Sequence, residues 1–179
     1  RMMWMQRMLE RENRIGDIYI LDNASRTASM FATTTMFILA GLVAILGALD
    51  KAQTIASELA FVVNASRELW EIKMFLLLII FVYAFFTFVW AIRQSNFALT
   101  MVAAAPERHE KNTLHRAGFA ERCARLITRG ENSFNRGVRA YYFGLAVLAW
   151  FIHPWVFMAA TILVVLVLHR REFRSITLK

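Results

Sequence analysis

Residues Met74–Trp90 read MFLLLIIFVYAFFTFVW, and this stretch decides the fold. It contains no charged residue, no glycine and no proline, and the chain stays uncharged as far as Ile92. As a helix, residues 74–92 extend about 28 Å, close to the ~30 Å thickness of a bilayer's hydrocarbon core. The stretch therefore predicts a helix that crosses a membrane.

Three other apolar segments lie in the chain, at 28–49, 138–152 and 155–168. The composition agrees with a membrane protein, since 58% of the 179 residues are hydrophobic and only 19% are charged. We predict an all-α integral membrane helical bundle: a single membrane domain, 1–179, with four transmembrane helices and additional cytoplasmic interfacial helices. Because residues 138–152 and 155–168 are short and separated by "IHPW", we expect a tight hairpin between them.

The basic residues predict the orientation of these spans. Arginine and lysine gather before the first span, between the second and third, and after the fourth. Between the first and second, Lys51, Arg67 and Lys73 are opposed by four acidic residues. Since positive charge favours the cytoplasmic side, the amino terminus, the long loop and the carboxyl terminus of this multi-pass protein are predicted to be cytoplasmic. The net charge of +8 has this origin, and no nucleic-acid partner is predicted.

The segments outside the spans carry weaker patterns. Residues 1–21 are predicted to form an interfacial helix, with Met5, Met8, Leu9 and Ile15 on one face. Residues 93–137 form a cytoplasmic extension and loop, in which the second helix continues to Pro106. A weak helical period from Leu114 to Ile127 places Phe119, Cys123, Leu126 and Ile127 on one side, and "GENSFN" after it predicts a loop before the third span.

Small residues predict where helices pack. Close approach in lipid depends on small side chains and interhelical hydrogen bonds. A helix-packing ridge is predicted on the first span, and Ala140 with Gly144 forms a shorter one on the third. The phenylalanines of the second span are predicted to fill grooves beside these ridges or to face lipid. The first ridge consists of Ala40, Gly41, Ala44, Gly47 and Ala48.

Polar residues concentrate at the predicted cytoplasmic ends of the spans, in a collar that exceeds what orientation alone requires. Asp17 and Asp22 are costly near an apolar boundary unless paired, so we expect them to meet arginines from other spans. The collar is a candidate site for anionic lipids or a partner subunit. It comprises Arg14, Asp17, Asp22, Arg26, Arg93, Gln94, Arg136, Arg139, Tyr141, Tyr142, Arg170 and Arg171.

The sequence offers no pattern for catalysis, a metal or a cofactor, and none is predicted. His153 and His169 lie about 24 Å apart along a helix, too far to share one haem iron, and His153 is expected in a turn. The hydroxyls of Ser29, Thr33, Thr34 and Thr35 are expected to bond their own helix carbonyls. The alternative is a polar seam with Tyr83 and Thr87.

The chain resembles a family of bacterial inner-membrane proteins, with relatives in plants, that is catalogued as a domain of unknown function. The sequence motifs that resemble this family include "NRIGDIYIL", "RAYYF", "VLHRREFRS" and the aromatic run that ends in "IRQSNF". They cover most of residues 1–175, and the loop from Glu107 to Arg129 departs most. The resemblance implies a multi-helix membrane protein, and a further hydrophobic segment ahead of Arg1.

These observations predict a scaffold or accessory subunit of a larger inner-membrane complex, or a homo-oligomer, that contacts membrane lipids. One alternative is a small oligomeric channel or transporter, with Ser29, Thr33, Tyr83 and Thr87 along its path. The spans lack ionisable residues at their centres, which disfavours ion-coupled transport. A second alternative is a lipid-modifying enzyme, which would need Asp17 or Asp22 unpaired in a cleft.

Overall fold

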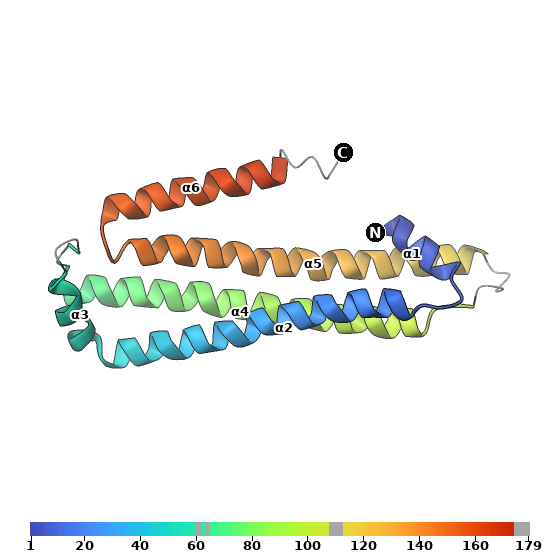
Figure 1. Ribbon diagram of the computed structural model, residues 1–179, viewed down its shortest axis with the longest axis horizontal. Coiled ribbons are helices and arrows are strands. Elements are labelled where there is room, and N and C mark those ends of the chain that lie inside the picture. Colours follow the sequence, from blue (N-terminus) through green and yellow to red (C-terminus); the bar gives the residue numbers. More distant parts are fainter. Residues whose placement is uncertain (60–61, 64, 108–112, 174–179) are drawn as a thin grey trace. The chain divides into compact units, whose positions relative to one another are not determined.

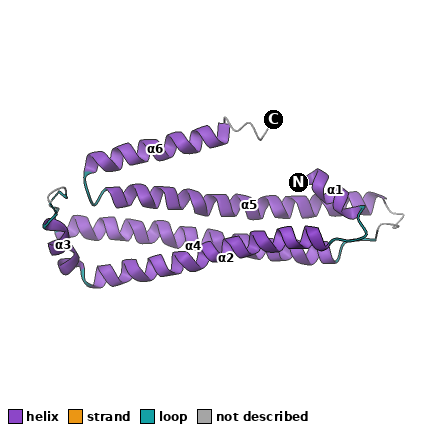
Figure 2. Ribbon diagram, viewed as in Figure 1, coloured by secondary structure: helices purple, strands orange, loops and turns teal. Residues whose placement is uncertain are grey.

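The computed structural model describes residues 1–59, 62–63, 65–107 and 113–173, without the side chains of 113–114 and 171–173. This described part is helical and contains no strand (Figure 2). Its helices are α1 (Met2–Leu9), α2 (Ile15–Gly47), α3 (Leu49–Ser57), α4 (Arg67–Ala103), α5 (Thr113–Ala149) and α6 (Pro154–Phe173) (Figure 1). The all-helical prediction is confirmed.

Two helices, α2 and α4, are long and apolar enough to cross a membrane. They contain the predicted span 74–92 and all but the last two residues of the span 28–49. The segment 138–152 lies at the end of α5 and in the turn that follows, and the segment 155–168 lies within α6. Membrane crossing by these last two segments stays a prediction.

The chain divides into two compact units. Unit 1 consists of Arg1–Thr33 and Phe85–Arg136, and unit 2 consists of Thr34–Ala84 and Gly137–Lys179. Because α2, α4 and α5 contribute to both units, this division leaves the single membrane domain a prediction.

Unit 1 has its own hydrophobic core. Met5, Met8 and Leu9 of α1 are buried there with residues of α2, α4 and α5. The predicted single helix over residues 1–21 is therefore wrong in its bounds, because the helix ends at Leu9 and a new one begins at Ile15. The interfacial position of this segment stays a prediction. The predicted apolar side of 114–127 is confirmed, because Phe119, Cys123, Leu126 and Ile127 all contribute to this core.

The predicted loop at "GENSFN" is also wrong, since α5 runs through it without interruption. Gly130 packs against α4 there: a Cβ atom on it would lie 3.4 Å from Cβ of Gln94, an ordinary contact distance. Ser133 donates a hydrogen bond to the carbonyl of Arg129 one turn back, so it is compatible with the helix. Asn132 and Asn135 are exposed and cap no helix.

Unit 2 packs α4 against α5 through a large residue facing a small one. A Cβ atom on Gly144 would lie 3.0 Å from Cζ of Phe81, which is 4% exposed. The Phe81 ring also meets Tyr141 edge-on, with ring centroids 5.2 Å apart. The predicted shorter ridge at Ala140 and Gly144 therefore receives a phenylalanine of the second span, while Phe75 and Phe86 stay exposed.

The predicted hairpin at "IHPW" is present between α5 and α6. Pro154 occupies the first position of α6, where its missing N–H costs no hydrogen bond. His153 caps this helix, because its Nδ1 accepts a hydrogen bond from the Trp155 amide at 3.2 Å. The prediction that His153 is a turn residue is confirmed.

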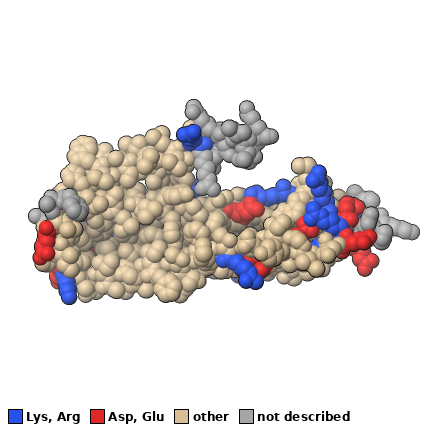
Figure 3. All heavy atoms as spheres, in the orientation of Figure 1, with Lys and Arg blue, Asp and Glu red and all other residues tan. Residues whose placement is uncertain are grey.

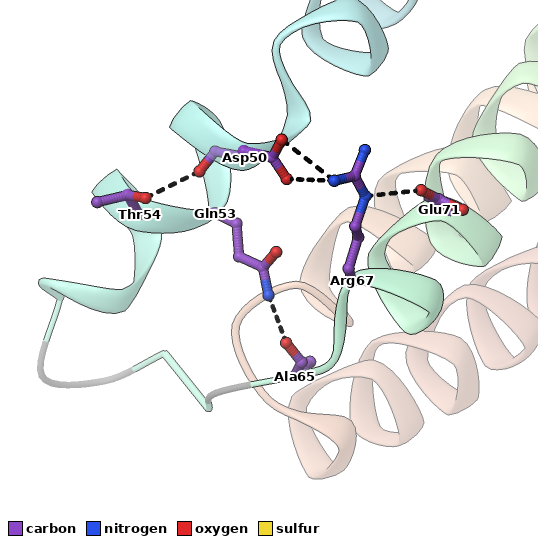
Figure 4. A network of polar contacts seen from close by, with 6 residues as sticks. All are labelled: Asp50, Gln53, Thr54, Ala65, Arg67 and Glu71. Atoms are coloured by element: carbon purple, nitrogen blue, oxygen red, sulfur yellow. Dashed lines mark hydrogen bonds and ion pairs between the residues drawn. The ribbon is translucent and has the colours of Figure 1, made fainter.

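A polar network closes the connection between α3 and α4 (Figure 4). Arg67 lies 2.8 Å from Asp50 of α3 and 3.1 Å from Glu71 of its own helix. Gln53 donates to the carbonyl of Ala65 at 2.6 Å. These contacts are exposed, so each ion pair adds little to stability, but together they tie α3 to the start of α4.

Candidate functional site

The predicted collar residues divide between the two units. Figure 3 shows red and blue atoms where α3 lies, blue atoms near the end of α6, and a mostly tan surface along the other helices of unit 2. The acidic and basic collar residues with described side chains differ in their burial and in their hydrogen-bond partners.

Asp17 is the most buried member of the collar, with no exposed surface. Its Oδ1 accepts hydrogen bonds from Nε1 of Trp4 at 2.6 Å and from Arg11 at 2.7 Å. The expectation that Asp17 meets an arginine is confirmed, but Arg11 lies six residues away in the connection before α2, not on another span. Asp17 therefore fixes α1 and the α1–α2 connection to α2.

Asp22 and Arg14 also have structural roles within unit 1. Asp22 pairs with Arg26 at 2.7 Å on the same helix, so its expected partner from another span is also wrong. Arg14 donates to the carbonyls of Ala105 and Pro106, which fixes the start of α2 beside the end of α4. Since each of the two carboxylates has an arginine partner, neither offers the unpaired acid that a lipid-modifying enzyme would need here.

Gln94 is buried inside unit 1, beside Gly130 of α5. Its Oε1 has no hydrogen-bond partner among the described residues. Two residues on, the exposed Asn96 accepts a hydrogen bond from the Ser25 hydroxyl at 3.0 Å. Gln94 therefore belongs to helix packing within unit 1, and Asn96 links α4 to α2 there.

Arg93 is different, because it is exposed on α4 and held by two aromatic rings. Its guanidinium carbon lies 5.8 Å from the ring centre of Trp90 and 5.4 Å from that of Phe97. Both rings are about half exposed, at 52% and 50%. Within the described part of the chain, no carboxylate pairs with Arg93 and no carbonyl accepts from it.

The remaining collar residues are dispersed. Arg136 bonds within α5, to the carbonyl of Asn132 and the hydroxyl of Ser133. Arg139 and Arg170 are exposed, and Tyr142 is half-buried. The side chain of Arg171 lies outside the described residues.

Tyr141 belongs to the interior of unit 2. Its hydroxyl lies 2.7 Å from Oγ1 of Thr35, which has no exposed surface. The sequence did not pair these two residues. Ser29 bonds the carbonyl of Ser25 one turn back, as expected, whereas Thr33 and Tyr83 are exposed. The buried hydroxyl pair of Thr35 and Tyr141 therefore lies outside the set of residues proposed to line a channel.

Lys73 is a buried charge, and no pattern in the sequence predicts its burial. It is 4% exposed and donates to the carbonyl of Trp150 at 3.0 Å, just after the end of α5. Its ammonium lies 5.1 Å from the Trp150 ring and 5.3 Å from the Phe151 ring. A cation is favoured at a helix carboxyl terminus and over aromatic faces, so Lys73 stabilises the turn into α6.

The arrangement defines a class: an all-helical protein with two helices long and apolar enough to cross a membrane. Among the residues that the structure describes, no group of three histidine, cysteine or acidic side chains could hold a metal. The family model described as "Protein of unknown function, DUF599" matches residues 1–177, and the chain belongs to this family. Neither the curated proteins nor the solved structures gave a match.

Proposed function

We propose that the protein is an integral membrane scaffold or accessory subunit that binds copies of itself or other membrane subunits and contacts anionic lipids. Its amino terminus, the loop before α5 and its carboxyl terminus lie on the cytoplasmic side of a bacterial inner membrane. The distribution of arginine along the chain supports this orientation. The apolar length of α2 and α4 supports the location.

The observation that carries the proposal is the unused packing ridge of α2. Its five residues, Ala40, Gly41, Ala44, Gly47 and Ala48, are all exposed. A Cβ atom added to Gly41 or Gly47 would meet nothing within 4 Å. The core of unit 2 is instead contacted by other residues of the helix, among them Ile38, Leu42 and Leu46.

Such a surface suits another helix better than it suits lipid alone. Small residues let two helix backbones approach closely, so dispersion contacts accumulate over the length of the contact. Larger exposed side chains flank the ridge, including Phe37 at 74% and Val43 at 58% exposure. A smooth strip between bulky side chains is the shape that accommodates a partner helix.

Gly41→Leu is expected to weaken association at least about fivefold, because a bulky side chain on the ridge keeps the partner backbone away. Native mass spectrometry from mild detergent would measure the fraction of oligomer, or of complex with co-purified subunits. The matched control is Ala159→Leu, an equally small and exposed position on α6. A wild-type protein that is only monomeric and carries no other subunit would contradict the proposal, as would equal effects of the two substitutions.

A further inference from the structure

Arg93 stands where α4 changes from an apolar to a polar helix. It is the first charged residue after residues 74–92, which contain none. If this stretch lies in lipid, Arg93 is placed at the level of the phospholipid headgroups. The inference drawn below rests on the membrane location proposed above.

The setting of Arg93 leaves its hydrogen-bond donors available. The rings of Trp90 and Phe97 lie one turn before and one turn after it and hold the guanidinium by cation–π attraction. Contact with ring faces restrains the side chain without using its N–H groups, which point outward in the guanidinium plane. Arg26, in contrast, has its carboxylate partner Asp22 on the same helix.

The apolar residues beside Arg93 complete a surface suited to a lipid. Phe86, Trp90, Arg93 and Phe97 are spaced by four, three and four residues, so they share one face of α4. Phe86 is 63% exposed, one turn before Trp90. This face therefore offers aromatic surface on the membrane side of an arginine whose donors match the two oxygens of a phosphate.

We propose that Arg93, with Trp90 and Phe97, binds the phosphate of an anionic phospholipid, and that the acyl chains lie along α4 beside Phe86. Arginine recognises the phosphodiester by two parallel hydrogen bonds. A net negative headgroup is preferred over a zwitterionic one because no choline or amine competes with the guanidinium. The site thus assigns the lipid contact of the proposed scaffold to one face of α4 in unit 1.

Native mass spectrometry of the full chain, with added phosphatidylglycerol or phosphatidylcholine, tests this assignment. We expect phosphatidylglycerol to bind more strongly, and Arg93→Gln to lower its binding about fivefold, towards that of phosphatidylcholine. Arg93→Lys keeps the charge but loses the planar fork, so it is expected to lie between the two. The matched control is Arg125→Gln, which removes one exposed arginine that is already paired with Glu121.

A second variant guards against misfolding of the first. Trp90→Leu with Phe97→Leu retains Arg93 and an apolar face, and it is expected to reduce the preference for phosphatidylglycerol roughly two- to fivefold by releasing the guanidinium. Unchanged preference in both Arg93→Gln and the double variant would overturn the assignment. Displacement of phosphatidylglycerol by millimolar inorganic phosphate would also overturn it, because the site would then belong to a free anion.

The same spectra separate this proposal from that of a scaffold. Gly41→Leu should change the oligomer or complex and leave the phosphatidylglycerol preference as it is. Arg93→Gln should do the reverse. Loss of the lipid preference in Gly41→Leu but not in Arg93→Gln would contradict the lipid site while leaving the association surface standing.

Discussion

Asp17→Ala is expected to release α1 from unit 1 and to cost about 2–3 kcal/mol, because the buried carboxylate accepts charge-assisted and indole hydrogen bonds. Arg11 is half exposed and can turn to water, which keeps the effect below that of a fully buried pair. Trypsin cleavage after Arg7, inside α1, would then accelerate about 30-fold or more.

Asp22→Ala provides the matched control for this experiment. It removes a carboxylate from the same helix whose arginine partner is largely exposed, at 78%. An exposed pair of this kind contributes little to stability, so cleavage after Arg7 should hardly change. If Asp17→Ala is cleaved no faster than Asp22→Ala, Asp17 does not hold α1 in place.

Gly144→Leu is expected to destabilise unit 2 by about 1–3 kcal/mol, because the new side chain would occupy the space of the Phe81 ring. Phe81 cannot swing away freely, since it is buried and packs edge-on against Tyr141. Thermal unfolding in detergent, followed by circular dichroism, would measure the loss. The matched control is Gly16→Leu, where an added Cβ meets nothing within 4 Å.

A second substitution tests the cause of that loss. Phe81→Ala opens the space that the introduced leucine side chain would need, so the double variant should be more stable than the sum of the two single effects predicts. Strict additivity would mean that Gly144→Leu acts elsewhere, and an unchanged Gly144→Leu protein would show that the interface can repack.

The long apolar segments were predictable because helix formation in them follows from composition alone. The turn at His153 and Pro154 was also predictable, since proline interrupts a helix and is tolerated at its first position. The continuity of α5 through Gly130 was not. In a sequence, glycine close to asparagine indicates a break, whereas here Gly130 lies inside α5 and packs against α4, a tertiary contact that local propensity does not contain.

The candidate site was predictable in residue types and not in partners. The cost of an unpaired carboxylate made a partner for Asp17 predictable. Its identity was not, because the break between α1 and α2 places Trp4 and Arg11 beside Asp17 in place of an arginine from another span. Thr35 and Tyr141 are separated by 106 positions, and no period in the sequence relates them. Arg93 and its two rings could have been found, because Trp90 and Phe97 lie at helical spacings of three and four on either side.

Labelling of single cysteines in intact cells with a membrane-impermeant maleimide tests the proposed membrane location and orientation of the chain. Burial raises the pKa of the native Cys123 thiol to about 11, so its reactive thiolate is scarce at neutral pH, and Cys123→Ala removes the residual background. New cysteines at Ser57, the last residue of α3, and at Arg125, on α5, are both at exposed positions. The proposed orientation predicts that the maleimide labels Ser57→Cys from outside the cell and labels Arg125→Cys only after permeabilisation. Labelling of both positions from outside, or of neither before permeabilisation, would contradict it.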